Sequence, residues 1–425
     1  MNGKTPITTL SRSKTLLKGA FTIGSKKTKQ FAKKAFLSKE EYSKEAKKIE
    51  SEIATALFEN IALLKGTAVK IAQAFVLHNI LPKTIQEELA KSYNQITPIN
   101  KALVIKIIKQ EHGKEPSKLF KEFDLTPFAS ASLGQVHKVT TYSNETLAIK
   151  IQYPGIDKTV QSDIKLIKRL IGYKKNIQRV INEVEKRLQE EIDYKQEMQN
   201  TIWAYNNLQN SDIIIPKVYK EYSTKHILAT SYIQGKDLYS WLQTNPPQES
   251  KNKIANIIFE NFIDSIFKHH TIQADPNPAN YIITPNNQVA LIDFGCLKHF
   301  TKEFIDNYIS LLRNYRSNNK EEILKIYKQI GFIKDPQDIN DKIFTTKILP
   351  FNKWAIEPFV HEEYTFTKEY LDQGVQFANI FLNKPFLVVE DFIFLDRLTH
   401  GLFSLFEQMH ATINMQKIRE IINLK

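Results

Sequence analysis

One stretch, residues 273–295 (QADPNPANYIITPNNQVALIDFG), constrains what this chain can fold into more than any other. Asn280 follows Asp275 by five residues, and an Asp-Phe-Gly triplet begins thirteen residues later at Asp293. Kinase-type phosphoryl transfer needs a carboxylate beside the attacking hydroxyl, with an amide oxygen and a second carboxylate to hold Mg²⁺ on ATP. The five-residue step matches the kinase catalytic loop, and a hairpin turn at 285–287 would bring loop and triplet face to face. An ordinary Asx turn followed by a hairpin is the alternative interpretation.

Length and composition bound the class of protein. A chain of 425 residues, 42% hydrophobic and 25% charged, is typical of a globular protein with one two-lobed core or two domains. No uncharged apolar run approaches the roughly 18–20 residues that cross a bilayer, so we expect no transmembrane span. The single cysteine, Cys296, excludes an intramolecular disulfide and fits a reducing compartment. The net charge of +13 favours anionic partners.

We expect four parts along the chain. Residues 1–38 form a basic, flexible segment, residues 39–118 a helical extension, residues 119–235 a first lobe and residues 236–425 a second. The basic segment has no acidic residue before Glu40. It fits a solvated tail, an anchor on anionic lipid or an organelle transit peptide.

The helical extension has apolar residues at steps of three and four. Lys70 and Gln73 lie three apart on one of its helices and project from nearly the same side. Taken alone, they are typical of a solvated surface. A further helix is predicted over 101–112, with Gly113 as its stop.

The first lobe opens with small residues, which allow a backbone to approach phosphate oxygens closely. They are followed by strand-like runs at 136–141 and 146–151, and the second run presents Lys150 after Ala-Ile, as the third strand of a kinase presents its phosphate-binding lysine. One long charged helix is predicted over 163–208, and one of its acids would orient that lysine.

The second lobe is predicted to be largely helical, with helices over 250–270, 303–317, 320–330, 338–348, 363–382 and 388–415. Arg397 is either a buried structural arginine or a family-specific contact, and we favour structure. His269 and His270 fit helix-end packing better than metal binding.

Several motifs in order carry a resemblance: residues 129–137, 150–155, 275–280 and 291–295, together with Glu-Ile-Asp-Tyr at 191–194. The chain resembles the UbiB/AarF/ADCK family of atypical, protein-kinase-like proteins. The match runs from about Leu64 through the triplet and weakly to Arg397 and Gly401. It implies an α+β, protein-kinase-like bilobal fold: an N-lobe with a small antiparallel sheet and a long helix, a helical C-lobe, and an N-terminal helical extension.

The resemblance also implies site roles. Lys70 and Gln73 reach into the active site, Glu197 orients Lys150, and Asp275 is the base or water-orienting residue. The Mg²⁺ ligands are Asn280 and Asp293. The nucleotide-binding set is Ala129, Ser130, Ala131, Ser132, Leu133, Gly134, Gln135, Lys150, Glu191 and Asp193. Ala72 and Ser130 stand where the family has glycine and alanine, and Asn277-Pro278-Ala279 where many members have His-Pro-Gly.

The expected function is that of an atypical kinase or ATPase using ATP and Mg²⁺ between two lobes, in support of ubiquinone or related isoprenoid-quinone biosynthesis at a membrane surface. Expected partners are anionic membrane lipids and quinone-biosynthesis proteins, with no nucleic acid. The expected location is the bacterial cytoplasm or membrane periphery, or the mitochondrion in a eukaryotic host. The alternatives are a nucleotide-gated lipid or protein scaffold with little turnover, and a conventional small-molecule or protein kinase.

Overall fold

The computed structural model describes residues 99–131, 133–171, 182, 185–186, 188–381, 385–387 and 389–423. The expected basic segment, the helical extension up to residue 98, and the candidates Lys70, Gln73 and Ser132 lie outside the described residues. The chain divides into two compact units. Unit 1 holds the described residues up to Gln196 and the segment Val218–Tyr232, and unit 2 holds Glu197–Lys217 and the described residues from Ile233 onward.

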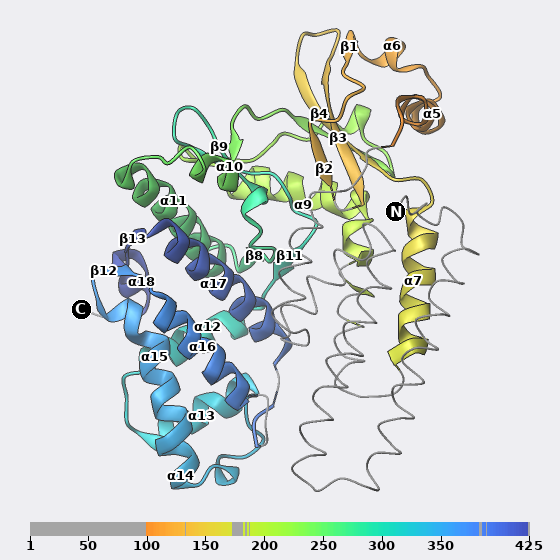
Figure 1. Cartoon of the computed structure of the whole chain (residues 1–425). Coiled ribbons are helices and arrows are strands. Elements are labelled where there is room, and N and C mark those ends of the chain that lie inside the picture. Colours follow the sequence, from red (N-terminus) through yellow and green to blue (C-terminus); the bar gives the residue numbers. More distant parts are fainter. Residues whose placement is uncertain are drawn as a thin grey trace, which may run out of the picture. The chain divides into compact units, whose positions relative to one another are not determined.

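Unit 1 is built on an antiparallel sheet, which Figure 1 shows beside helix α5. Strand β3 pairs with β1, β2 and β4, and β4 pairs with β6. The strands are β1 (Glu122–Phe123), β2 (Ala129–Ala131), β3 (Gly134–Thr140), β4 (Thr146–Gln152) and β6 (Ile227–Ser231). The turn between β3 and β4 places Asn144 at φ 63°, in the left-handed region that asparagine tolerates. The strands predicted over 136–141 and 146–151 are present as β3 and β4, each within two residues of the predicted bounds.

Helix α5 (Lys101–His112) has the predicted bounds. Asn100 caps its first turn by accepting from the Leu103 N–H at 2.8 Å, and Gly113 ends it at φ 68°. The apolar face of α5, including Val104 and Ile108, packs into one hydrophobic cluster with residues of the sheet. The rest of unit 1 comprises α6 (Pro116–Leu119), α7 (Ile156–Ile171), the 3-10 turn η2 (Lys220–Tyr222) and the start of α9 (Tyr194–Asn207).

The prediction of one helix over 163–208 is wrong at its middle. The backbone leaves the helical conformation at residues 192–193, and α9 begins afresh at Tyr194. Asp193 Oδ1 accepts from the Gln196 N–H at 3.1 Å, which is the bond of a helix N-cap. Asp193 therefore caps the first turn of a second helix.

Unit 2 is mainly helical. Its helices are α10 (Leu238–Leu242), α11 (Gln248–Phe267), α12 (Lys302–Asn314), α13 (Lys320–Ile330), α14 (Asp341–Ile343), α15 (Leu349–Val360), α16 (Lys368–Phe381), α17 (Glu390–Met409) and α18 (Gln416–Ile421), with the 3-10 turns η3 (Pro278–Asn280) and η4 (Pro336–Asp338) and the π-helical turn η5 (Phe344–Ile348). Its strands are β5 (Ile213–Ile214), β7 (Lys236–Asp237), β8 (Thr271–Gln273), β9 (Tyr281–Ile283), β10 (Val289–Leu291), β11 (Leu297–His299), β12 (Glu363–Thr365) and β13 (Thr412–Asn414). The largely helical second lobe is confirmed, and none of the described helices is long and apolar enough to cross a bilayer.

Two predicted helices of unit 2 extend too far. The helix predicted over 363–382 begins as strand β12, and the helix predicted over 388–415 ends before strand β13, which pairs with β12. His410 ends α17 at φ 51°, a left-handed conformation. The two strands are three residues each, too short for an alternating pattern to distinguish them from helix ends.

The core of unit 2 surrounds α11 and α17. The rings of Phe259 on α11 and Phe406 on α17 lie 6.2 Å apart, edge to face, and both are fully buried. Phe294 of the Asp-Phe-Gly triplet is fully buried in the same core. The triplet is therefore anchored by its aromatic side chain, while its neighbours remain at the edge of the core.

Candidate active site

A hairpin in unit 2 brings the predicted catalytic loop and the triplet together. Strands β9 and β10 pair antiparallel, and the turn between them places Asn287 at φ 55°, as the sequence predicted for 285–287. The Ile292 N–H donates to the Asn280 carbonyl at 3.1 Å. Asn280 and the residue before Asp293 are therefore hydrogen-bonded neighbours at one end of the hairpin.

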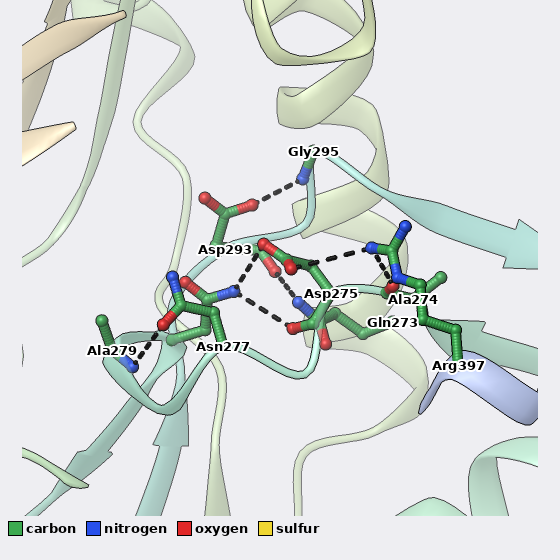
Figure 2. Close-up of polar contacts among 9 residues, drawn as sticks. Gln273, Ala274, Asp275, Asn277, Ala279, Asp293, Gly295 and Arg397 are labelled. Carbon is green, nitrogen blue, oxygen red and sulfur yellow. Dashed lines mark hydrogen bonds and ion pairs between the residues drawn. The ribbon is translucent and has the colours of Figure 1, made fainter. Parts of the chain in front are cut away.

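The amide of Asn280 is turned toward Asp275. Its Nδ2 donates to the backbone carbonyl and to Oδ2 of Asp275, both at 3.3 Å. Asn277 shapes the intervening turn, because its side chain accepts from the Ala279 N–H at 3.1 Å (Figure 2). Asparagine in place of the family histidine is therefore compatible with a well-formed loop.

The triplet is held by hydrogen bonds on both sides of Phe294. Gly295 N–H donates to Asp293 Oδ1 at 2.9 Å, and Gln273 Nε2 donates to the Asp293 carbonyl at 3.2 Å (Figure 2). Asn200 Nδ2 of α9 donates to the Phe294 carbonyl at 2.8 Å. These bonds fix the backbone from which the Asp293 carboxylate projects.

Glu197 lies beside the triplet within unit 2. Its side chain is buried, and a Cβ added to Gly295 would lie 4.0 Å from Glu197 Oε2. The predicted pairing of Glu197 with Lys150 joins residues of different units and stays a prediction. The candidates that the structure does bring together in unit 2 are Asp275, Asn280, Asp293 and Glu197.

The segments on either side of the loop and the triplet are paired with each other. Strands β8 and β11 run antiparallel with Gln273 opposite Leu297, and the Ala274 N–H donates to the Cys296 carbonyl at 2.8 Å. The backbone just before Asp275 is therefore tied to the backbone just after Gly295.

Arg397 on α17 contacts the catalytic loop at Ala274, which lies 123 residues earlier in the sequence. Its Nη2 donates to the Ala274 carbonyl at 2.7 Å and lies 3.8 Å from Asp275 Oδ1 (Figure 2). The structural role that we favoured from sequence is therefore incomplete, because this arginine faces the candidate base. No local spacing signals such a pair.

In unit 1, the small-residue segment forms the hairpin between β2 and β3, with Ala131 opposite Gly134. A Cβ on Gly134 would lie 2.4 Å from the Ile151 carbonyl oxygen and 2.9 Å from the Tyr194 hydroxyl, so packing alone requires glycine there. The side chain of Leu133 is buried.

Gln135 belongs to a buried polar chain in unit 1. Its Oε1 accepts from the Ile99 N–H at 2.9 Å, and its Nε2 donates to His137 Nε2 at 2.7 Å. His137 Nδ1 in turn donates to the Asp124 carbonyl at 2.8 Å. The whole of Gln135 is buried and its side chain is engaged, so its predicted part in nucleotide binding stays a prediction.

Lys150 on β4 lies opposite Val136, and its Nζ lies 5.1 Å from the centre of the Tyr194 ring. Gln152 Nε2 donates to the Ile192 carbonyl at 2.8 Å, which ties the Glu-Ile-Asp-Tyr segment to the end of β4. Glu191 of that segment is half-buried. The segment that carries Glu191 and Tyr194 is therefore held against the strand that carries Lys150.

The electrostatics of the loop keep the neighbouring tyrosine neutral. Burial, and to a lesser degree the Asp275 carboxylate, raises the pKa of Tyr281 above its ordinary value. Its hydroxyl therefore stays protonated at neutral pH.

The loop residues fit magnesium. Mg²⁺ prefers oxygen ligands and usually takes one or two carboxylates plus waters and substrate phosphates. Among the described residues no group of three or more His, Cys, Asp or Glu is placed to hold a metal by itself. Asn280, whose nitrogen bonds Asp275, would offer its amide oxygen, and Asp293 its carboxylate, so the protein would supply two ligands and ATP the others.

Comparison with known proteins identifies relatives. Residues 91–327 match a sequence model described as the ABC1 atypical kinase-like domain. The chain is 26% identical over 71% of its length to a probable serine/threonine-protein kinase abkA of Dictyostelium discoideum, covering 58% of that protein. It is 27% identical over 68% of its length to AarF domain-containing protein kinase 1 of Xenopus laevis, covering 58% of that protein. It is also 27% identical over 64% of its length to the mitochondrial atypical kinase COQ8 of Saccharomyces cerevisiae, covering 56% of that protein.

The chain thus spans a little over half the length of these relatives. Among solved structures, the complex of Rv3197 with erythromycin from Mycobacterium tuberculosis superposes with a TM-score of 0.64 at 22% identity, over 90% of this chain and 98% of that one. At this identity the similarity shows a shared fold.

Proposed function

Because this chain belongs to the ABC1 atypical kinase-like family, we propose that it binds Mg-ATP and acts as an atypical kinase or ATPase. The match to the family confirms the resemblance that the motifs indicated, and relatives named for AarF and COQ8 agree with it. The expected α+β, kinase-like fold is confirmed as well. The reaction, the acceptor and the cellular role are proposals.

The arrangement of Asp275, Asn280 and Asp293 carries the proposal. Asn280 bonds both the backbone and the carboxylate of Asp275, and its own carbonyl bonds the residue before Asp293. An ordinary Asx turn explains neither a carboxylate held against an amide nor a second carboxylate just after the next strand, β10. Phosphoryl transfer uses this set of groups.

In the proposed mechanism Asp275 accepts the proton of the attacking hydroxyl, or orients an attacking water. Asn280 and Asp293 hold Mg²⁺, which when bound neutralises charge on the phosphates. Lys150 binds the α/β-phosphates, and Glu197 orients Lys150. Residues 129–135, with Glu191 and Asp193, complete the nucleotide-binding set, and Lys70 and Gln73 belong to the site by family resemblance.

We extend the proposal to the support of ubiquinone or related isoprenoid-quinone biosynthesis at a membrane surface. The yeast relative is named for COQ8 and assigned to mitochondria. A net charge of +13 suits an anionic lipid surface. In this role anionic lipids and quinone-biosynthesis proteins are the partners, at the membrane periphery or in the cytoplasm of a bacterium, or in a mitochondrion.

Nucleotide binding is tested by thermal denaturation of the full chain with and without Mg-ATP, because a ligand of the folded state raises its apparent stability. Mg-ATP should raise the Tm of the wild type and of Lys121→Ala, an exposed lysine of the same unit that bonds Asn144. Lys150→Ala and Asp293→Asn should lose most of the shift. Equal shifts in all four proteins would remove the assigned roles.

Turnover separates the enzyme from a scaffold. ATP hydrolysis is measured with vesicles of phosphatidylcholine alone and of phosphatidylcholine with phosphatidylglycerol. We expect turnover that depends on Asp275 and rises on the anionic vesicles. Binding without turnover on either surface would favour the nucleotide-gated scaffold, and transfer to an added peptide or small molecule would favour a conventional kinase.

A further inference from the structure

We propose that helix α17 positions the catalytic loop. Arg397 and Gly401, one helical turn apart on α17, contact the residues just before and just after Asp275. The inference rests on the proposed function, in which Asp275 is the base or water-orienting residue. Both residues of α17 lie far in sequence from the catalytic loop that they position. Arg397 acts through Asp275 and is therefore a positioning residue.

The first hold is a hydrogen bond. Arg397 Nη2 donates to the carbonyl of Ala274, the residue just before Asp275, at 2.7 Å. A bond from a charged donor is roughly twice as strong as one between neutral groups. The Arg397 side chain is only 16% exposed, so water competes weakly for the same carbonyl.

The second hold is on the carboxylate itself. Arg397 Nη2 lies 3.8 Å from Asp275 Oδ1, while Asn280 Nδ2 donates to Oδ2 at 3.3 Å. The two oxygens of one carboxylate thus face different partners (Figure 2). An arginine on one side and an amide on the other oppose rotation of the carboxylate about its side-chain bonds.

The third hold is the close approach of Gly401, which has no side chain, to Pro276. A Cβ added to Gly401 would lie 2.4 Å from Cγ and 2.6 Å from Cβ of Pro276, the residue just after Asp275. Glycine is therefore the residue that lets α17 approach this closely. Residues 274 and 276 therefore both contact α17, at two positions of the helix that are four residues apart.

The helix is rigid enough to serve as a platform. Leu398, Leu402 and Phe406, on its inner face, are buried in the core of unit 2. Lys298 Nζ of β11 pairs with Asp391 Oδ1 in the first turn of α17 at 2.6 Å. This pair anchors the same helix to the same region without touching Asp275, which makes Asp391 a matched control.

The test compares Arg397→Met, Arg397→Lys and Asp391→Asn in the full chain. ATP turnover gives kcat and KM, and hydrogen exchange by mass spectrometry follows the peptide that contains residues 274–276. Arg397→Met should lower kcat by about 100-fold, the loss expected when a reacting group moves by about 1 Å, with KM for ATP changed less than about threefold. Its loop peptide should exchange faster than that of the wild type.

Three further variants separate positioning of the loop from general destabilisation. Arg397→Lys, which keeps the charge and loses the fork, should recover part of kcat. Asp391→Asn should leave kcat and loop exchange unchanged. Gly401→Ala should reproduce the faster exchange of Arg397→Met through Pro276 alone.

Unchanged kcat or unchanged loop exchange in Arg397→Met overturns the proposal, as does an equal loss in Asp391→Asn, which would mean general destabilisation. The exchange measurement needs no turnover. A wild type that neither binds nor hydrolyses ATP, but whose loop still loosens only in the Arg397 and Gly401 variants, would refute the proposed function and leave the positioning intact.

Discussion

The ammonium of Lys150 lies 5.1 Å from the centre of the Tyr194 ring, and the hydroxyl end of the same ring abuts Gly134. One buried tyrosine thus contacts both the candidate phosphate-binding lysine and the glycine that begins β3. A cation over an aromatic face is stabilised by about 0.5–2 kcal/mol. Tyr194 therefore helps to orient Lys150.

Replacing Tyr194 by leucine should weaken Mg-ATP binding about fivefold, since a cation–π contact of about 1 kcal/mol corresponds to that factor. Tyr194→Phe keeps the ring and should bind like the wild type. Calorimetric titration measures both. Tyr219→Leu is the control, a buried tyrosine of the same unit that bonds Glu145 instead, and equal loss in the two leucine variants would contradict the prediction.

Gly134→Ala should destabilise unit 1 by about 1–3 kcal/mol, because the added methyl overlaps the Ile151 carbonyl and the Tyr194 hydroxyl. Urea denaturation measures the loss. Gly113→Ala is the comparison: its φ is 68° but no atom lies near the added methyl, so only backbone strain of about 1 kcal/mol remains. A smaller effect at Gly134 than at Gly113 would argue against the packing explanation.

Stability should fall as the pH drops below about 6.5 because of His137. Burial lowers the pKa of this histidine, so the folded state keeps it neutral while the unfolded chain takes up a proton. The contribution of neutral His137 to the free energy of unfolding is complete above the pKa that this histidine has in the unfolded chain. It is lost as the pH falls toward the lower pKa of the folded state, with a slope of at most about 1.4 kcal/mol per pH unit.

The matched variant for this pH effect is His137→Asn, whose amide can still donate to the Asp124 carbonyl but does not titrate. Urea denaturation at pH 7.5 and 5.5, values on either side of about 6.5, should show a shallower loss in the variant than in the wild type. Parallel losses would assign the effect to other groups.

A buried pair in unit 2 offers a test of unpaired polar groups. The Tyr327 hydroxyl donates to Asn352 Oδ1 at 2.7 Å, and both side chains are fully buried. Tyr327→Phe should cost about 1–3 kcal/mol, because the amide oxygen is left without its donor. Adding Asn352→Leu should recover part of the loss by removing the unmatched amide, and a further loss in the double variant would contradict this account.

The sequence predicted those site features that are local. The spacing of Asp275 and Asn280 and the turn at 285–287 are enough to place Asn280 next to Asp293, since a hairpin fixes its own register. Helix α5 has the predicted bounds, and its end was marked in the sequence by Gly113.

Features that depend on distant partners were not predictable in this way. Arg397 meets Ala274 across 123 residues, and no periodicity along α17 distinguishes it from a structural arginine. The break inside the predicted long helix coincides with the Asp193 cap and with the bond from Gln152 to the Ile192 carbonyl, a partner 40 residues away in sequence. Strands β12 and β13 form only because they meet each other.

The pairing of β8 with β11 has a mechanical consequence. Three residue pairs and the bond from Ala274 to Cys296 join the strand entering the loop to the strand leaving the triplet. An outward movement of the strand that leaves the triplet, with the strand that enters the loop held still, would have to break this ladder. The segment that leads into the candidate base and the segment that follows Asp293 are therefore mechanically coupled, so that a displacement of either strand is passed to the other.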